Sequence, residues 1–111
     1  MKLKYINTIG LILAISQQFA FCQSEKKELR SGNQNYSQGK YKESEKNYSE
    51  ALKKNPNYLK ANYNLGASLY KQGKFTEASN QFELSTNGTT SKDTLAMILH
   101  NQGTSMIKEK K

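Results

Sequence analysis

Few residues in this sequence have types and spacings that could support catalysis. His100 is the single histidine, and the sequence gives it no partner that would complete a catalytic triad. Glu25 with Glu28, and Glu43 with Glu45, could in principle act as paired carboxylates in acid–base chemistry. Both pairs fall in highly charged stretches, where we expect solvated helix surfaces instead.

Metal, disulfide and phosphate chemistry are equally poorly supported. One cysteine, Cys22, excludes an internal disulfide, and with one histidine it does not make a zinc site. Asp93 is the only aspartate, which weakens any carboxylate metal site. No strand is predicted, so no glycine-rich phosphate loop follows one. We therefore expect a protein that is not an enzyme and that needs no cofactor.

The composition places the chain close to the limit of what folds. Its 111 residues suffice for one domain, and it carries a net charge of +8 at pH 7. Valine is absent, which disfavours a buried parallel sheet. Leu, Ile and Phe together make up 21 residues, or 19%, within the range typical of disorder at high net charge. Order must therefore come from a regular pattern.

The first 22 residues have the pattern of a secretory signal peptide. Lys2 and Lys4 precede a short apolar run over 6–15, and polar residues follow it. The run is too short to cross a bilayer as a stable helix. We expect cleavage after Cys22, which leaves a mature chain without cysteine; lipidation of Cys22 is the alternative.

A repeat of 34 residues occupies the remainder of the chain. The strings at 36–41 and 70–75 are almost copies of each other, and a third start near residue 100 follows after three extra residues. The coinciding pairs include Gly32 and Gly66, Tyr36 and Tyr70, Gly39 and Gly73, Tyr41 and Phe75, Ser44 and Ala78, and Tyr48 and Phe82.

Each repeat is predicted to form two antiparallel helices around a glycine-centred turn. The apolar spacing is that of helices, and Pro56 ends the second one. Gly32 and Gly66 fall inside helices, where they are expected to let an aromatic residue of the second helix approach closely. The expected helices span 25–38, 41–54, 58–72, 75–87 and about 93–110.

This layout resembles the tetratricopeptide repeat (TPR) family, which implies an all-α superhelix of helix hairpins. The likeness covers repeat one at about 25–58, repeat two at about 59–92 and a partial repeat three at about 93–111. The positions expected to pack the repeats together are Gly32, Gly39, Tyr41, Tyr48, Ala51, Pro56, Leu65, Gly66, Gly73, Phe75, Ala78, Phe82 and Gly103.

The resemblance also implies a partner-binding groove lined by the first helix of each repeat. Its Tyr, Asn and Lys/Arg side chains would suit a protein segment of acidic character. The groove positions are Lys26, Leu29, Arg30, Asn33, Tyr36, Lys60, Tyr63, Asn64, Ala67, Tyr70, Lys71, Met97, His100, Asn101, Thr104 and Lys108. Tyr63 and Tyr70 could instead serve only to pack neighbouring repeats.

A closer likeness is to the small exported TPR proteins of Bacteroides aerotolerance (Bat) operons. It rests on the signal-like start, the Gln at the expected mature terminus and the Leu99–Gly103 string after a Lys-Asp spacer. This resemblance implies a scaffold in the periplasm or cell envelope. Its partners would be membrane proteins with von Willebrand A-type domains.

The third repeat has a first helix only. That helix could act as a terminal cap, which would require a polar outer face. Its apolar residues instead predict a shortened array with an exposed apolar strip, formed by Leu95, Ile98, Leu99, Met106 and Ile107, with Met97 beside it.

The positive charge leaves a second kind of partner open. A basic groove with aromatic side chains could bind single-stranded nucleic acid, or the cations could contact an anionic membrane surface. The lysines are scattered among glutamates near helix ends, and export would separate the protein from nucleic acid. A protein partner is therefore the favoured expectation.

Overall fold

The computed structural model describes residues 2–111, with side chains described for 9–15 and 23–111. Within these residues the chain is all-α, as predicted, and contains no strand. Its helices are α1 (Lys2–Ser37), α2 (Tyr41–Lys54), α3 (Leu59–Lys71), α4 (Phe75–Thr86) and α5 (Lys92–Glu109).

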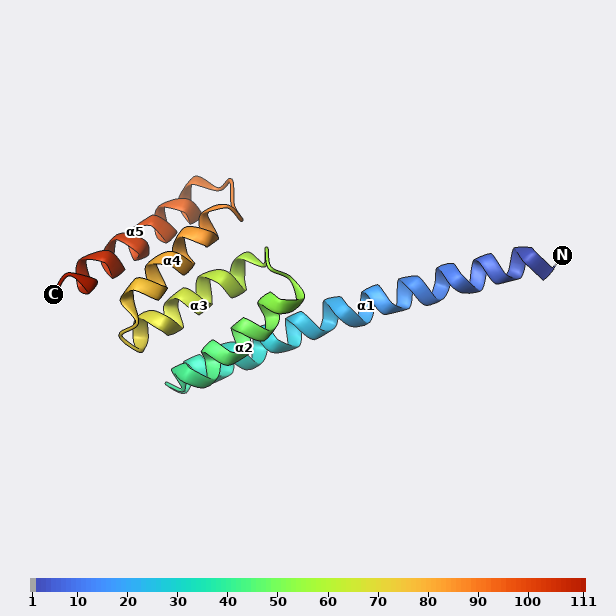
Figure 1. The fold of residues 1–111 in the computed structure, drawn as a ribbon, viewed down its shortest axis with the longest axis horizontal. Coiled ribbons are helices and arrows are strands. Elements are labelled where there is room, and N and C mark those ends of the chain that lie inside the picture. The colour runs from blue at the N-terminus through green and yellow to red at the C-terminus, as the bar shows by residue number, and fades with distance from the viewer. Residues whose placement is uncertain (1) are drawn as a thin grey trace.

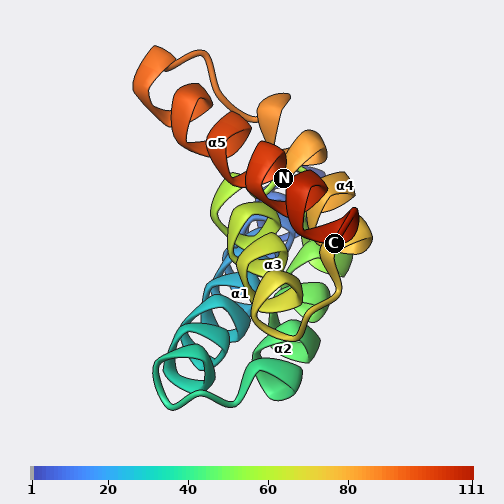
Figure 2. The ribbon, with the colours of Figure 1, turned by 90° about the vertical axis from the view of Figure 1, so that its left-hand side faces the viewer.

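The helices form antiparallel hairpins that stack in chain order. α1 packs on α2, α2 on α3, α3 on α4 and α4 on α5 (Figure 1). Seen from the side, α1, α3 and α5 form one layer, and α2 and α4 form the other (Figure 2). This alternation produces the superhelix of TPR-type hairpins that the sequence predicts, because each second helix is shared between two first helices.

The first helix is much longer than predicted. α1 begins at Lys2 instead of near residue 25, and its N-terminal half extends away from the hairpins (Figure 1). The predicted start is wrong because no proline or glycine interrupts the chain between Gly10 and Gly32, so nothing stops the helix. No helix in the part of the chain that the structure describes has the length and apolar character needed to cross a membrane.

Both hairpin turns have the same hydrogen-bonded geometry. Gly39 and Gly73 adopt φ values of +75° and +78°, which glycine reaches without strain. The following N–H groups, of Lys40 and Lys74, donate back to carbonyls five residues earlier, at 2.9 and 3.0 Å. These turns are Schellman motifs, and they confirm the predicted helix stops.

An aromatic ring from the second helix packs against a glycine of the first helix in both complete hairpins. The ring of Tyr48 lies over Gly32, and the ring of Phe82 lies over Gly66. A Cβ placed on these glycines would be 2.5 and 2.7 Å from the nearest ring carbons. The predicted close approach is therefore confirmed, and it explains the two glycines inside helices.

Small residues let neighbouring helices come close to each other. Ala51, Ala61 and Ala78 are fully buried. Ser44 of α2 and Ser68 of α3 are also fully buried, and their hydroxyls share a hydrogen bond of 2.7 Å. Because each buried hydroxyl has a partner, these serines fill the space of alanines without an unpaired polar group.

The third repeat lacks the aromatic cover that the other two have. Outside its own helix, no atom lies within 4 Å of a Cβ built on Gly103, so no aromatic ring packs on it as on Gly32 and Gly66. Ile98 is fully buried, whereas Leu99, Met106 and Ile107 are 50%, 47% and 61% exposed. The apolar strip is exposed as predicted at these three positions, whereas Ile98 is buried and Leu95 is half-buried, because α4 packs on that side of α5.

The glycine–aromatic contact predicts opposite effects for two matched substitutions. Gly66→Ala should lower the free energy of unfolding by about 1–3 kcal/mol, because the new methyl group overlaps the buried ring of Phe82. Gly103→Ala should leave it unchanged or raise it by up to about 1 kcal/mol, because alanine favours helix and meets open space. Urea unfolding followed by circular dichroism measures both, and equal effects would contradict this packing.

Candidate functional site

A pocket of about 510 Å³ opens on the layer formed by the first helices. α1, α3 and α5 each contribute to its wall, and two aromatic rings from the second helices complete it. The lining residues are Asn33, Tyr36, Tyr48, Tyr63, Asn64, Ala67, Tyr70, Phe82, His100, Asn101 and Thr104.

The pocket brings together most of the predicted groove positions and leaves out its cations. All of the lining residues on α1, α3 and α5 were predicted from the sequence. Leu29 is buried in the core, so its placement in the groove is wrong. The remaining predicted positions do not line the pocket, and they are Lys26, Arg30, Lys60, Lys71, Met97 and Lys108.

Tyr48 and Phe82 are lining residues whose binding role the sequence did not predict. Both were assigned to repeat packing, and both are almost completely buried in the core. They also reach the pocket because the glycine opposite each ring has no side chain to cover it. A glycine aligned with an aromatic residue of the next helix was the sequence signal that the ring edge would reach the pocket.

A hydrogen-bonded cluster joins the two complete repeats at one side of the pocket. The amide oxygen of Asn33 accepts from the Tyr48 hydroxyl at 2.8 Å and from the Asn64 amide at 3.0 Å. Both lone pairs of that oxygen are thereby used, which leaves the NH₂ group of Asn33 as its available hydrogen-bonding group. Within the described residues, no acceptor for that NH₂ group is found.

A second contact joins α3 to α5. The Asn101 amide donates to the Tyr63 hydroxyl at 2.6 Å, so this hydroxyl keeps its own proton for an external acceptor. The ring of Tyr63 also packs on Phe82, with centroids 5.6 Å apart. Tyr63 therefore packs the repeats together and lines the pocket, and the two predicted roles are combined in one residue.

Two further tyrosines are held by edge-to-face contacts at equivalent positions. Tyr36 packs on Tyr41 and Tyr70 packs on Phe75, each pair with centroids 5.2 Å apart. The contact orients each ring before any ligand arrives. Burial raises the pKa of Tyr36, with smaller contributions from Tyr41 and Tyr63, so its hydroxyl stays protonated and able to donate at neutral pH.

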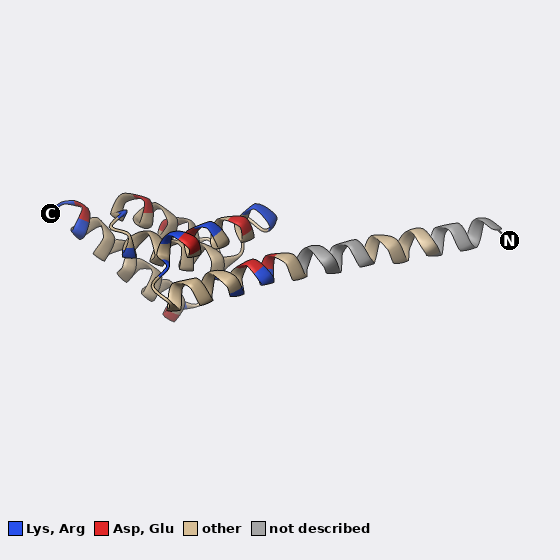
Figure 3. Ribbon diagram, turned by 90° about the horizontal axis from the view of Figure 1, so that it is seen from below, with Lys and Arg blue, Asp and Glu red and all other residues tan. Residues whose placement is uncertain are grey.

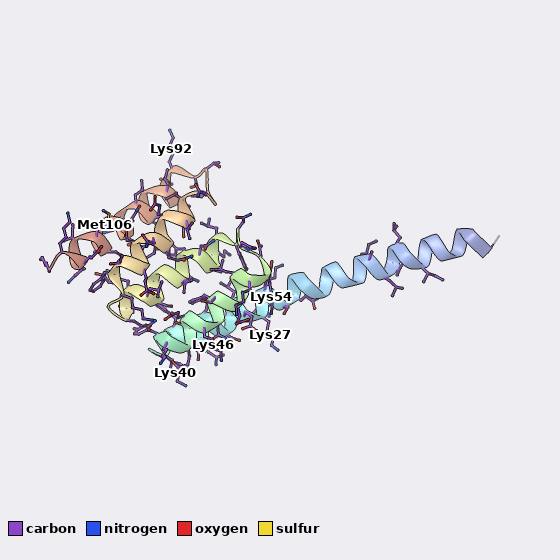
Figure 4. The ribbon with its side chains drawn as sticks, in the orientation of Figure 1. Lys27, Lys40, Lys46, Lys54, Lys92 and Met106 are labelled. Atoms are coloured by element: carbon purple, nitrogen blue, oxygen red, sulfur yellow. The ribbon has the colours of Figure 1, made fainter. Side chains whose placement is uncertain are left out.

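The charged side chains lie outside the pocket, and none contributes to its lining. Lys, Arg, Asp and Glu alternate along the helices and gather near their ends (Figure 3). Lys27, Lys40 and Lys46 lie along the α1–α2 edge, and Lys92 lies at the start of α5 (Figure 4). The cations predicted for the groove do not line this pocket, whose lining contains His100 but no Lys, Arg, Asp or Glu.

Several of the outer charges serve to join helices. Lys74 pairs with Glu45 at 3.2 Å, and Gln72 donates to the same carboxylate at 2.6 Å. Lys54 approaches Glu28 at 3.9 Å. No group of metal-ligating side chains occurs among the described residues.

The comparisons with known proteins agree with this architecture. Residues 32–73 match the model of a family described as TPR repeat. That segment runs from the close-packing glycine of the first hairpin to the turn glycine of the second. A search of curated proteins found no match to the chain.

The family match supports the TPR resemblance and the kind of function that it implies. TPR repeats are generally non-enzymatic and typically mediate the binding of protein partners. The repeats thus suggest a scaffold for protein–protein interaction.

The buried hydroxyl of Tyr48 predicts a loss of stability in alkali. Burial raises the pKa of Tyr48 to about 12, Tyr36 adds to the rise, and the neighbouring amide of Asn64 opposes it. Because the folded pKa lies above the unfolded value, up to about 3 kcal/mol of stability is present below pH 10 and lost as the pH rises towards 12.

Tyr48→Phe tests this, since the ring remains against Gly32 as Phe82 does against Gly66. The free energy of unfolding of the variant should be about 1 kcal/mol lower at pH 7, because the hydrogen bond to Asn33 is lost. The stability of the variant should also fall less as the pH rises above 10. Helicity and tyrosinate absorbance are measured against pH for both proteins. Unfolding of both proteins over the same pH range would contradict the prediction.

Proposed function

We propose that the protein is an interaction scaffold whose pocket binds an extended segment of a partner protein. The observation that carries the proposal is the pocket itself, with asparagine and tyrosine side chains from α1, α3 and α5 around one opening. A volume of about 510 Å³ lies in the range of pockets that bind small ligands, so it accommodates a few residues of a peptide.

The polar groups of the pocket match those of a peptide backbone. Asn33 and Tyr63 offer donors, while the amide oxygens of Asn64 and Asn101 offer acceptors. An extended segment exposes both kinds of group because its own backbone forms no internal hydrogen bonds. Binding would therefore exchange hydrogen bonds with water for hydrogen bonds with the pocket.

The uncharged lining argues against a charged chain terminus as the ligand. The sequence predicted an acidic partner, but the cations expected to attract it lie outside the pocket. A buried carboxylate needs a paired cation, and the lining supplies no Lys or Arg for this. An internal segment without buried charge suits these residues better.

The proposed setting is the cell envelope. Among the described residues, no buried side chain precedes Glu25, and the apolar side chains at 9–15 are exposed. The repeats would therefore keep their described core after removal of residues 1–22. The likeness to exported Bat-operon proteins, with partners that carry von Willebrand A-type domains, remains a prediction from the sequence.

Selection from a peptide library tests binding at the pocket. We expect a displayed library of random 12-residue peptides to yield sequences that bind the chain and shift the side-chain amide NMR signals of Asn33, Asn64 and Asn101. Asn64→Ala should weaken binding roughly 5- to 50-fold, since it removes an amide from the lining.

Asn80→Ala is the matched control, because Asn80 is exposed on α4 and does not line the pocket. It should bind the selected peptides as well as the original chain does. The proposal fails if no peptide is selected, or if binding is equally sensitive to Asn64→Ala and Asn80→Ala.

Export is tested separately in a bacterial host. We expect the envelope fraction to contain a chain beginning at Gln23, identified by mass spectrometry. Ile12→Arg should retain the protein in the cytosol by interrupting the apolar run, whereas Ile107→Arg, on exposed α5, should not. An unprocessed chain beginning at Met1 would contradict export, and a lipid-modified Cys22 would establish the alternative processing.

A further inference from the structure

We propose that the outer side of α5 docks an amphipathic helix of a partner protein, with two aromatic residues seven positions apart and an acidic first turn. The docking surface, here the α5 face, is formed by Leu99, Gly103, Met106 and Ile107. α5 lies at one end of the stack of hairpins, and Met106 marks its C-terminal half (Figures 1 and 4). None of the four residues lines the pocket, so the α5 face is a second binding surface beyond that of the proposed function.

The equivalent face of α3 is covered by α4. The string at 100–106 repeats that at 63–69, so the positions of α3 that correspond to Leu99, Gly103 and Met106 are Asn62, Gly66 and Leu69. All three are buried. The amide of Gln81 on α4 donates to Asn62. The ring of Phe82, also on α4, packs on Gly66.

On α5 the same positions are open and more apolar. Leu99 and Met106 are about half exposed, and no ring lies on Gly103. Leu99 also takes the place of the polar Asn62. The α5 face is therefore the kind of surface that α1 and α3 present to a second helix, and the next place in the layer of α2 and α4 lies beside it (Figure 2).

The two second helices show which residues a docked helix needs. Each carries aromatic residues at its first and eighth positions, which are Tyr41 and Tyr48 in α2 and Phe75 and Phe82 in α4. The eighth-position ring packs on a glycine of the first helix, and the first-position ring packs on a tyrosine near the end of that helix. Gly103 and Ile107 occupy these two positions on α5. A partner helix with the same aromatic spacing would therefore place one ring on each.

Charge at the C-terminal end of α5 favours an acidic first turn in the partner helix. Lys108, Lys110 and Lys111 are exposed there, and none of the ion pairs found among the described residues involves them. A helix that packs antiparallel to α5, as α2 and α4 pack against their first helices, begins at this end. Glu43 and Glu77 lie in the first turns of α2 and α4. An acidic residue there is attracted by the lysines and by the N-terminal end of its own helix dipole.

The net charge and the sequence of α5 argue against a second copy of the chain as the occupant. Each copy carries +8, so two copies repel each other in solution. α5 also has no aromatic residue that it could place on Gly103 of a second copy. An acidic helix with aromatic residues meets both requirements.

A peptide that copies α4 is the probe, because α4 has both aromatic residues and the acidic first turn. A labelled peptide of residues 75–86 with blocked termini is titrated with the full chain, and its fluorescence anisotropy is measured. We expect saturable binding that shifts the backbone amide NMR signals of Gly103 and Ile107. Phe82→Ala in the peptide should weaken binding about tenfold or more, because the ring for Gly103 is lost. Glu77→Gln in the peptide should weaken it about 2- to 5-fold at low salt.

Gly103→Leu is the matching change in the chain. Its side chain fills the space that the ring needs, so peptide binding should weaken about tenfold or more. Helicity should be retained, since leucine favours helix and meets open space at this position. Lys92→Leu is the control, because it adds the same side chain at the exposed start of α5, about 16 Å along the helix from Gly103. This control should bind the peptide as the original chain does.

Docking at the α5 face is overturned if the peptide does not bind, if its Phe82→Ala variant binds equally well, or if Gly103→Leu and Lys92→Leu have the same effect. It is also overturned if sedimentation shows a dimer of the chain that Gly103→Leu abolishes, because a second copy would then occupy the α5 face. Gly103→Leu should leave the binding of library-selected peptides at the pocket unchanged, so the two binding surfaces are tested separately.

Discussion

The close contact between an aromatic ring and a glycine is the constraint on which the structure depends. Tyr48 over Gly32 and Phe82 over Gly66 bring the helices of each hairpin together at a distance that any side chain would prevent. The contact buries large rings in a chain that has no valine and whose described core contains three leucines. Alanine and serine then suffice at the remaining helix contacts, which explains how a composition near the limit of order still forms a core.

The same contact shapes the candidate site. Because the glycines do not cover them, the two rings reach from the second helices into the pocket between the first helices. The Tyr48 hydroxyl fixes the Asn33 amide, which leaves its NH₂ group available to a ligand. The core and the pocket lining therefore share residues, and a substitution in the core will alter the pocket as well.

The charged side chains and the pocket lining occupy different parts of the surface. The chain carries a net charge of +8, yet the pocket is lined by neutral groups. The lysines lie at edges and helix ends, where several pair with glutamates of a neighbouring helix. Net charge thus describes the outer surface of this protein, whereas phenol and amide groups line the pocket.

The sequence by itself determined the repeat, the helices and their turns. Gly39 and Gly73, Pro56 and the aligned aromatic residues act locally, so their effects are readable from spacing. The pocket positions on α1, α3 and α5 are among those that the resemblance to TPR repeats implied. The start of α1 was not determined, because helix propensity continues through 16–31 without a stop signal.

Only the tertiary structure decided which of these residues line the pocket. The resemblance to TPR repeats placed Leu29 and Arg30 in the groove, but packing buries the first and leaves the second outside the pocket. It also brought Tyr48 and Phe82 into the lining, and it left Gly103 without an aromatic cover. These outcomes depend on which helix lies opposite each position, and that is set by the stacking of hairpins distant in sequence.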